Sequence, residues 1–371
     1  MNKQSFLARF LSIRMQVHPT WYLATILITV ILVTQYPGDY LLVERIIFGL
    51  LGSLLFLATI AVVSFVHNLV ATLMYVSIKN VTLFVFDGVT VVPGDGTQPG
   101  REALLAGITW WLNLAAAGIF NWIYLSQPDT SRSPMVLLLQ WLAFFWYMLA
   151  IFHILPAFPL AGGRLMAAII WRIRGNYLKS VRFSARIGWL FGMGLSLWGV
   201  AVLVTTGGRT VNALLLIFFG WALQGASSLS LKRASILGAL EDIKARNIMT
   251  MEFAIIGADL IISDIIRDYV LITGQDFFPI AEGKRLLGII TADDIKSIPK
   301  RRWKSTSVGS VMTLSRTVRT VSGYDSAAHA IEMMDQFSVE SLPVLDNGYI
   351  IGILTRSDLE RLANVRSRLK V

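Results

Sequence analysis

The sequence is organised around a long apolar stretch, IIFGLLGSLLFLATIAVVSFVHNLVATLM, which occupies residues 46–74. This stretch carries no charged residue and exceeds the roughly 20 apolar residues that a helix needs to cross a bilayer. Two polar side chains, His67 and Asn68, lie in its second half. Because polar groups at membrane depth are costly, this pair marks a functional or formerly functional position.

Other stretches of the chain are similarly apolar. Of the 371 residues, 55% are hydrophobic and 15% are charged, a composition typical of membrane proteins rather than soluble ones. We predict a polytopic α-helical membrane protein with about six spans, at roughly 19–36, 46–76, 102–125, 135–155, 187–206 and 211–230.

Lysine and arginine residues are distributed unequally between the two sides of the predicted bundle. Three precede the first span, and the other loops on that side carry Lys79, Arg101, Arg172, Arg174, Lys179, Arg182, Arg186, Lys232 and Arg233. The opposite loops carry Arg45, Arg132 and Arg209. The positive-inside rule therefore predicts an integral protein of the cell membrane with both termini in the cytoplasm. This asymmetry accounts for much of the net charge of +10, so we expect no nucleic-acid partner. The absence of cysteine excludes disulfides and cysteine-ligated zinc.

Beyond residue 230 the composition becomes that of a soluble domain, and the sequence repeats. Ile-Met-Thr at 248–250 recurs as Val-Met-Thr at 311–313, Phe-Pro-Ile at 278–280 as Leu-Pro-Val at 342–344, and Gly-Ile-Ile-Thr-Ala-Asp-Asp at 288–294 as Gly-Ile-Leu-Thr-Arg-Ser-Asp at 352–358. Matched offsets of 63 and 64 residues over these segments indicate a true repeat. We predict a membrane domain at 1–230, a linker at 231–246, and repeats at 247–303 and 304–371.

The two copies resemble a pair of cystathionine-β-synthase (CBS) domains, which implies a cytoplasmic α/β domain after the bundle. Pairs of this family often bind an adenine nucleotide. The resemblance assigns ribose contacts to Asp294 and Asp358, phosphate contacts to Thr291 and Thr355, and a further phosphate contact to Arg356. A helix N-terminus does offer N–H donors to an anion. The two aspartates suit a purely structural role as helix caps equally well.

Two further segments of the membrane domain depart from regular helix. Prolines 156 and 159 and glycines 162 and 163 interrupt the helical pattern after His153, near the depth of His67. Irregular backbone at that depth is tolerated only where protein or a cavity surrounds it. Between the second and third spans, residues 81–92 predict a short β-hairpin around Asp87-Gly88.

Together, these elements resemble the site-2 protease family of intramembrane zinc metallopeptidases, in its subgroup with a C-terminal CBS pair. The order matches: His18-Pro-Thr, the His67 helix, the hairpin and the Pro/Gly segment. In that family an H-E-x-x-H sequence supplies two zinc ligands and a general base, and a distant aspartate supplies the third ligand. Zinc-bound water then attacks the peptide carbonyl.

This chain departs from the family at most of those positions. His67 matches the first ligand, but Asn68 stands at the general base, Ala71 at the second ligand and Ala161 at the aspartate. His153 stands where the family usually has asparagine, and the family's asparagine after the hairpin corresponds to Asn113. Since a catalytic zinc normally has three protein ligands, we expect neither stable zinc nor catalysis.

The leading hypothesis is therefore a non-proteolytic homologue that binds or regulates other membrane proteins. Its expected partners are the bilayer, single-span segments at the hairpin edge, an adenine nucleotide and a second copy in a homodimer. One alternative is an active peptidase whose zinc is held by His67, His153 and Asp87. Another is a CBS-regulated channel or transporter, although the spans show no obvious charge ladder or repeated half.

Overall fold

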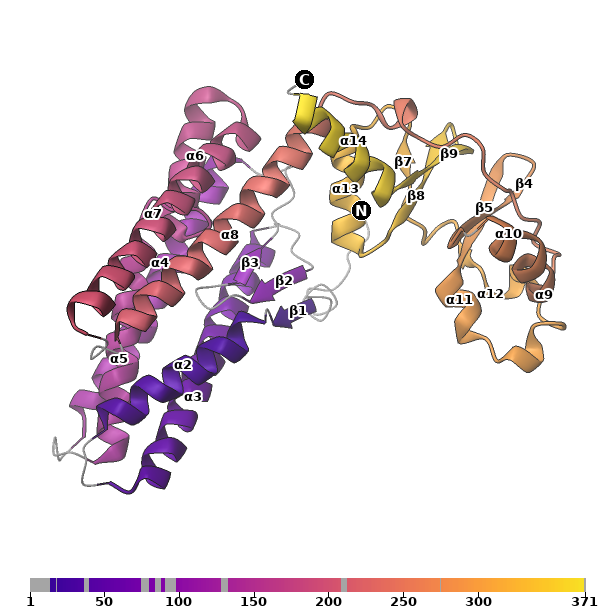
Figure 1. The fold of residues 1–371 in the computed structure, drawn as a ribbon. Coiled ribbons are helices and arrows are strands. Elements are labelled where there is room, and N and C mark those ends of the chain that lie inside the picture. Colours follow the sequence, from indigo (N-terminus) through magenta and orange to yellow (C-terminus); the bar gives the residue numbers. More distant parts are fainter. Residues whose placement is uncertain are drawn as a thin grey trace. The chain divides into compact units, whose positions relative to one another are not determined.

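The computed structural model describes residues 14–17, 19–36, 40–74, 80–83, 88–90, 98–127, 133–207, 212–273 and 275–369. The chain divides into two compact units, Met1–Ala234 and Ser235–Val371. Each unit is described by itself below (Figure 1).

The first unit is a bundle of long helices. They are α2 (Thr20–Gln35), α3 (Leu42–Leu73), α4 (Pro99–Leu125), α5 (Pro134–Phe152), α6 (Ala161–Arg174), α7 (Tyr177–Thr205) and α8 (Asn212–Leu240). Among the described residues, α3, α4, α5, α7 and α8 are long and apolar enough to cross a membrane, and α2 is an apolar helix of 16 residues. These six helices match the six stretches predicted from the sequence, whereas α6 was not predicted as a separate helix.

A small sheet accompanies the bundle. Strand β1 (Arg14–Val17) pairs in parallel with β2 (Asn80–Leu83), and β2 pairs antiparallel with β3 (Gly88–Thr90). The sheet order is β1-β2-β3, so β3 is an edge strand of the described sheet. Strands β2 and β3 correspond to the predicted hairpin, while the predicted turn residue Asp87 lies outside the described residues.

The backbone between α5 and α6 is irregular, and several polar groups in and beside it form hydrogen bonds within the protein. The Gly162 amide donates to the His153 carbonyl at 2.7 Å. Ser227 of α8 donates its hydroxyl to the Phe158 carbonyl at 2.6 Å, and Ser184 of α7 donates to the Gly163 carbonyl at 2.7 Å. Because an unsatisfied backbone group in an apolar environment is costly, these serines permit a break at this depth.

An ion pair buried inside the bundle connects α4 to α6. Arg164 Nε lies 2.8 Å from Glu102 Oε1, and the two side chains are 9% and 4% exposed. Both charges stand at the first turn of their helices, Glu102 on α4 and Arg164 on α6. The pair thus fixes the start of the helix that follows the break.

The second unit contains two similar halves. The first comprises β4 (Phe277–Glu282), β5 (Arg285–Thr291) and α11 (Ala292–Ser297), and the second β8 (Ser341–Asp346), β9 (Tyr349–Thr355) and α14 (Arg356–Leu369). Shorter elements connect them: α9 (Ile262–Ile265), η2 (Ile266–Val270), α10 (Leu271–Thr273), η3 (Lys300–Arg302), α12 (Val308–Val311), β6 (Thr313–Leu314), β7 (Val321–Ser322) and α13 (Ala327–Phe337), after η1 (Ala245–Asn247). The sheet runs β4-β5-β9-β8-β7, with β6 paired to β5.

Strand register reproduces the sequence repeat. Phe277 pairs with Thr291 across β4 and β5, and Ser341 pairs with Thr355 across β8 and β9. Each Met-Thr segment, however, pairs with the other half. Thr313 of the second copy pairs with Ile289 of β5, and Thr250 of the first copy bridges Ile353 of β9. The halves are therefore interlocked by exchanged segments.

This exchange explains the glycine that opens each Gly-x-x-Thr motif. A Cβ built on Gly288 would overlap the Thr313 carbonyl oxygen, and one on Gly352 would lie 2.6 Å from Met249 Cγ. Any larger residue would push the crossing segment away.

The unit boundary falls inside α8 rather than in an extended linker. The helix continues to Leu240, and the chain then turns into η1 at Ala245. The sequence prediction of a linker from 231 to 246 followed the loss of apolar residues at Lys232 and Arg233. Lysine and arginine are good helix formers, so the helix persists beyond the apolar run.

The crossing geometry predicts the effect of Gly288→Ala. The added methyl group overlaps backbone, so we expect a loss of about 1–3 kcal/mol in the unfolding free energy of the second unit, measured by urea denaturation of residues 235–371. Gly257→Ala is the matched control, because a Cβ there meets nothing within 4 Å. Equal stability of the two variants would contradict the interlocked arrangement.

The buried ion pair predicts the outcome of a double-mutant cycle. Arg164→Met leaves the Glu102 carboxylate buried without its cation, which should cost about 3–5 kcal/mol. Glu102→Gln combined with Arg164→Met removes both charges and should cost less than Arg164→Met alone. Thermal unfolding in detergent micelles measures Arg164→Met, Glu102→Gln and the double variant, and additive losses would show that the two side chains are not coupled.

Candidate functional site

The candidate site begins on the inward face of α3. Buried residues on this helix recur with helical spacing: Gly49, Gly52, Ser53, Phe56, Leu57, Ile60, Ser64, His67, Asn68 and Ala71. The last three stand where the sequence comparison placed catalytic groups, and all are at most 1% exposed. Amphipathic spacing therefore aims His67, Asn68 and Ala71 into the bundle rather than at lipid.

The described hydrogen bond of His67 joins it to α4. Its Nδ1 lies 2.9 Å from the hydroxyl oxygen of Thr109. That hydroxyl also lies 3.1 Å from the Leu105 carbonyl oxygen. In the tautomer in which Thr109 donates to Leu105 and accepts from His67 Nδ1–H, the imidazole lone pair is on Nε2. This is the orientation in which a histidine can ligate a metal while a neighbour holds its other nitrogen.

Asn68 is oriented along its own helix. Its Nδ2 donates to the Ser64 carbonyl one turn earlier at 2.7 Å. A carboxamide cannot take up a proton as a carboxylate does, so Asn68 cannot act as a general base. On α4, Asn113 is buried and donates to the Thr109 carbonyl at 2.9 Å, which places it one turn from the partner of His67.

The segment after α5 contributes His153 and Ala161. His153 is 1% exposed, and its Nδ1 lies 2.8 Å from the Leu149 carbonyl oxygen. A carbonyl oxygen only accepts, so Nδ1 of this histidine also carries a hydrogen. Ala161 is buried at the first position of α6 and has no side-chain atom that could ligate a metal.

These residues do not fit a catalytic zinc ion. The described part of the chain contains no group of three or more histidine, cysteine, aspartate or glutamate side chains placed to hold a metal. Ala71 and Ala161 supply no donor, and one imidazole is not a tetrahedral ligand set. Asp87 and His18 lie outside the described residues, so a set that includes Asp87 stays a prediction.

In the second unit, Thr291 and Asp294 form a capping box at the start of α11. The Thr291 backbone N–H and hydroxyl donate to Asp294 Oδ2 at 2.9 and 2.7 Å, and the Asp294 N–H donates to Thr291 Oγ1 at 3.2 Å. Such reciprocal bonds satisfy orphan donors at a helix start.

The second repeat has the same arrangement with added cations. Thr355 Oγ1 donates to Asp358 Oδ2 at 2.7 Å, and Arg361 donates to Asp358 Oδ1 at 2.9 Å. Arg356 lies 2.6 Å from Asp335 and 3.1 Å from Glu340. Partial burial lowers the pKa of Arg356, but the hydrogen bond to Asp335 and the carboxylates of Asp335, Glu340 and Glu360 outweigh this and raise it. A phosphate would thus compete with two carboxylates for Arg356.

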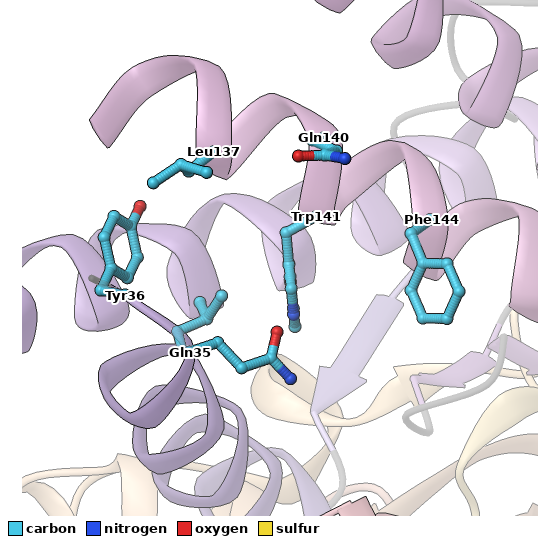
Figure 2. Close-up of a pocket in the computed structure, with 7 residues that line it drawn as sticks. Gln35, Tyr36, Leu137, Gln140, Trp141 and Phe144 are labelled. Carbon is cyan, nitrogen blue, oxygen red and sulfur yellow. The ribbon is translucent and has the colours of Figure 1, made fainter. Parts of the chain in front are cut away.

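A pocket of about 330 Å³ opens between α2 and α5, away from His67. Figure 2 shows Trp141 projecting from α5 toward Gln35 of α2, with Tyr36 at one end and Phe144 at the other. Tyr36 donates its hydroxyl to the Pro134 carbonyl at 3.0 Å. The lining contains no charged side chain. Leu32, also in the lining, faces Gly52 of α3, which precedes His67 by about 22 Å along the helix.

The sequence prediction did not include Thr109, Glu102 or Arg164 among the site residues. Thr109 stands one helical turn before Asn113, so helical spacing from Asn113 was the available signal. Glu102 and Arg164 are charges at the ends of apolar helices, where a solvated position is the usual expectation. No local pattern pairs two residues 62 positions apart.

Comparisons with known proteins agree with this architecture. Residues 308–364 match the family model of the CBS domain. Zinc metalloprotease MJ0392 of Methanocaldococcus jannaschii is 25% identical over 98% of this chain and 97% of its own length. Rip3 of Mycobacterium tuberculosis, whose name assigns it provisionally to the zinc metalloproteases, is 27% identical over 93% of this chain and 87% of its own length.

Among solved structures, the site-2 protease from Methanocaldococcus jannaschii covers 59% of this chain and 91% of its own, at 19% identity and a TM-score of 0.47. The near full-length relatives, the apolar helices and the CBS match together settle the class. The chain is a homologue of the site-2 protease family, a membrane protein with a C-terminal CBS domain.

Proposed function

We propose that this site-2 protease homologue does not cleave peptides and instead binds other membrane proteins under the control of its CBS pair. The observation that carries the proposal is the composition of the inward face of α3. His67 remains, while Asn68 and Ala71 provide neither a general base nor a second ligand. Ala161, the first residue of α6, has no side-chain atom that could serve as the third metal ligand.

The packing around these positions supports a retained binding scaffold. His67 is held by Thr109, the break after α5 is satisfied by two serines, and Glu102 pairs with Arg164. Such costly buried polar contacts are expected where a site keeps its shape. Loss of the catalytic groups therefore leaves the surrounding architecture intact.

The sheet offers a place for an extended client segment. Strand β3 is an edge of the described three-stranded sheet, and an edge strand presents unpaired backbone N–H and C=O groups. A partly unwound segment of a single-span protein could add to that edge by main-chain hydrogen bonds. In this proposal both termini lie in the cytoplasm, as the positive-inside rule predicts.

The CBS pair is proposed to bind an adenine nucleotide. Asp294 and Asp358 offer carboxylate oxygens to a ribose diol, and the N-termini of α11 and α14 offer N–H donors to phosphate. Thr355 and Arg356 add a hydroxyl and a guanidinium at the second repeat. Displacement of Asp335 or Glu340 from Arg356 would accompany phosphate binding there.

The proposal predicts that the purified protein holds no stoichiometric zinc at His67. The triple variant Asn68→Glu, Ala71→His and Ala161→Asp restores a full ligand set and should acquire about one zinc per chain, as expected for three protein ligands. Elemental analysis by mass spectrometry measures both, and His67→Ala in the triple variant is the control.

Zinc bound to the wild-type chain at one per molecule and lost on His67→Ala would overturn the proposal. Cleavage of a single-span substrate by wild type, abolished by the same substitution, would overturn it independently.

A second prediction concerns the nucleotide. Calorimetric titration of residues 235–371 with ATP, ADP and AMP should detect binding, weakened at least about tenfold by Asp358→Ala because charged hydrogen bonds to ribose are lost. Asp358→Asn keeps an oxygen that can cap α14 and separates loss of binding from loss of stability. Asp346→Ala, at the end of β8, is the matched control. Absence of heat with all three nucleotides would indicate that the CBS pair has a structural role only.

A further inference from the structure

A basic loop projects from the first CBS repeat. Residues 300–304 read Lys-Arg-Arg-Trp-Lys, and all four cationic side chains are exposed. Trp303 is half-buried, and the Lys300 ammonium lies 5.9 Å from the centroid of its ring. We call residues 300–304 the basic platform.

The basic platform is ordered by its backbone and by its tryptophan. The Trp303 indole N–H donates to the Ile298 carbonyl at 3.0 Å, and its ring packs against the core that contains Phe278 and Ile290. Backbone bonds from Ser263 N to Trp303 O and from Ile262 N to Thr306 O attach it to α9. The four charges are therefore pre-organised on one fixed turn rather than carried on a flexible tail.

Within the described residues, no carboxylate lies within the 4.0 Å of an ion pair from any of these four cations. The acidic side chains of neighbouring elements are engaged elsewhere. Asp264 of α9 pairs with Arg267 at 3.2 Å, and Asp293 of α11 pairs with Lys296 at 3.0 Å. Asp294 accepts the capping bonds of Thr291. The positive charge of the platform is thus not neutralised by the protein itself.

This charge is a local feature of the second unit. Residues 235–371 contain 17 lysines and arginines and 17 aspartates and glutamates, so the unit has a formal net charge of zero. The whole excess of +10 belongs to the first unit. A neutral domain that concentrates four unpaired cations in five residues differs from nucleic-acid-binding domains, which are typically basic as a whole.

We propose that the basic platform binds anionic phospholipid headgroups of the membrane in which the chain resides. Helix α8 continues from the first unit into the second, so the second unit is tethered to the bilayer at a high effective concentration. Four cations over five residues span about 10 Å, comparable to the Debye length at physiological salt. Each cation near an anionic surface raises the equilibrium constant for contact roughly fivefold. Contact between the platform and the membrane therefore increases with the content of anionic lipid.

The test uses the full chain, which contains no cysteine, so Ser305→Cys introduces a unique labelling site beside the platform. A bimane label at residue 305 is measured in nanodiscs that carry a headgroup-attached nitroxide quencher. We expect strong quenching when the nanodisc contains phosphatidylglycerol and little in pure phosphatidylcholine. About 1 M salt, where the Debye length falls to about 3 Å, should abolish the difference.

Charge substitutions separate this contact from other causes. Lys300→Gln, Arg301→Gln and Arg302→Gln together should reduce the contact equilibrium on the order of 100-fold. The matched control removes three exposed cations elsewhere in the unit, Lys284, Arg285 and Arg316, each replaced by Gln, and should leave quenching unchanged.

Quenching that is equal in neutral and anionic nanodiscs, or insensitive to the platform triple variant, would overturn the proposal. So would shielding of the label in neutral nanodiscs by polyuridylate at matched phosphate concentration, since the platform would then be a general polyanion site. Because none of these outcomes depends on zinc or nucleotide, they are independent of the function proposed above.

Discussion

A break between α5 and α6 at membrane depth requires partners inside the protein for the backbone donors and acceptors that it exposes. A regular helix satisfies its own backbone, whereas a break at membrane depth does not. Here Ser227 of α8 donates to the Phe158 carbonyl in the break, and Ser184 of α7 donates to the Gly163 carbonyl in the first turn of α6. The Cβ that any other residue would add at Gly163 would overlap the backbone of Ala157 and Phe158. The positions of α6, α7 and α8 therefore follow from the same constraint.

The same constraint bears on the function proposed above, a non-proteolytic homologue that keeps the shape of the site. A buried aspartate at position 161 would carry a charge that needs a compensating partner. Ala161 carries none, so it adds no desolvation penalty. His67 is hydrogen-bonded to Thr109, whose hydroxyl also lies within hydrogen-bond distance of the Leu105 carbonyl. Glu102 and Arg164 cannot be lost singly without leaving a buried charge. In the proposed non-proteolytic homologue, Ala71 and Ala161 therefore need no charged partner, whereas Glu102 and Arg164 need each other.

Sequence alone predicted the elements whose signal is local or periodic. Apolar runs predicted the six helices that include α2, and offset matching predicted the two repeats. The structure adds that β4–β5 and β8–β9 share the same register. It did not predict α6 as a separate helix, because the prolines before it suggested only a break. The Glu102–Arg164 pair and the exchange of Thr250 and Thr313 between halves depend on tertiary contacts. Neither has a counterpart in residue spacing.

The exchanged segments give the CBS pair a physical route to the helix that precedes it. After Leu240 the chain passes along the second repeat, where the Ala245 amide donates to the Asp325 carbonyl and Thr250 exchanges both backbone bonds with Ile353. Ile353 lies two residues before Thr355, at the proposed phosphate position. On the other side, Arg366 of α14 donates to the Ala239 carbonyl of α8 at 3.0 Å. In the proposed nucleotide-binding role, a ligand at the start of α14 would act on elements that hold the end of α8. It would do so only by binding two arrangements of these elements with different affinity.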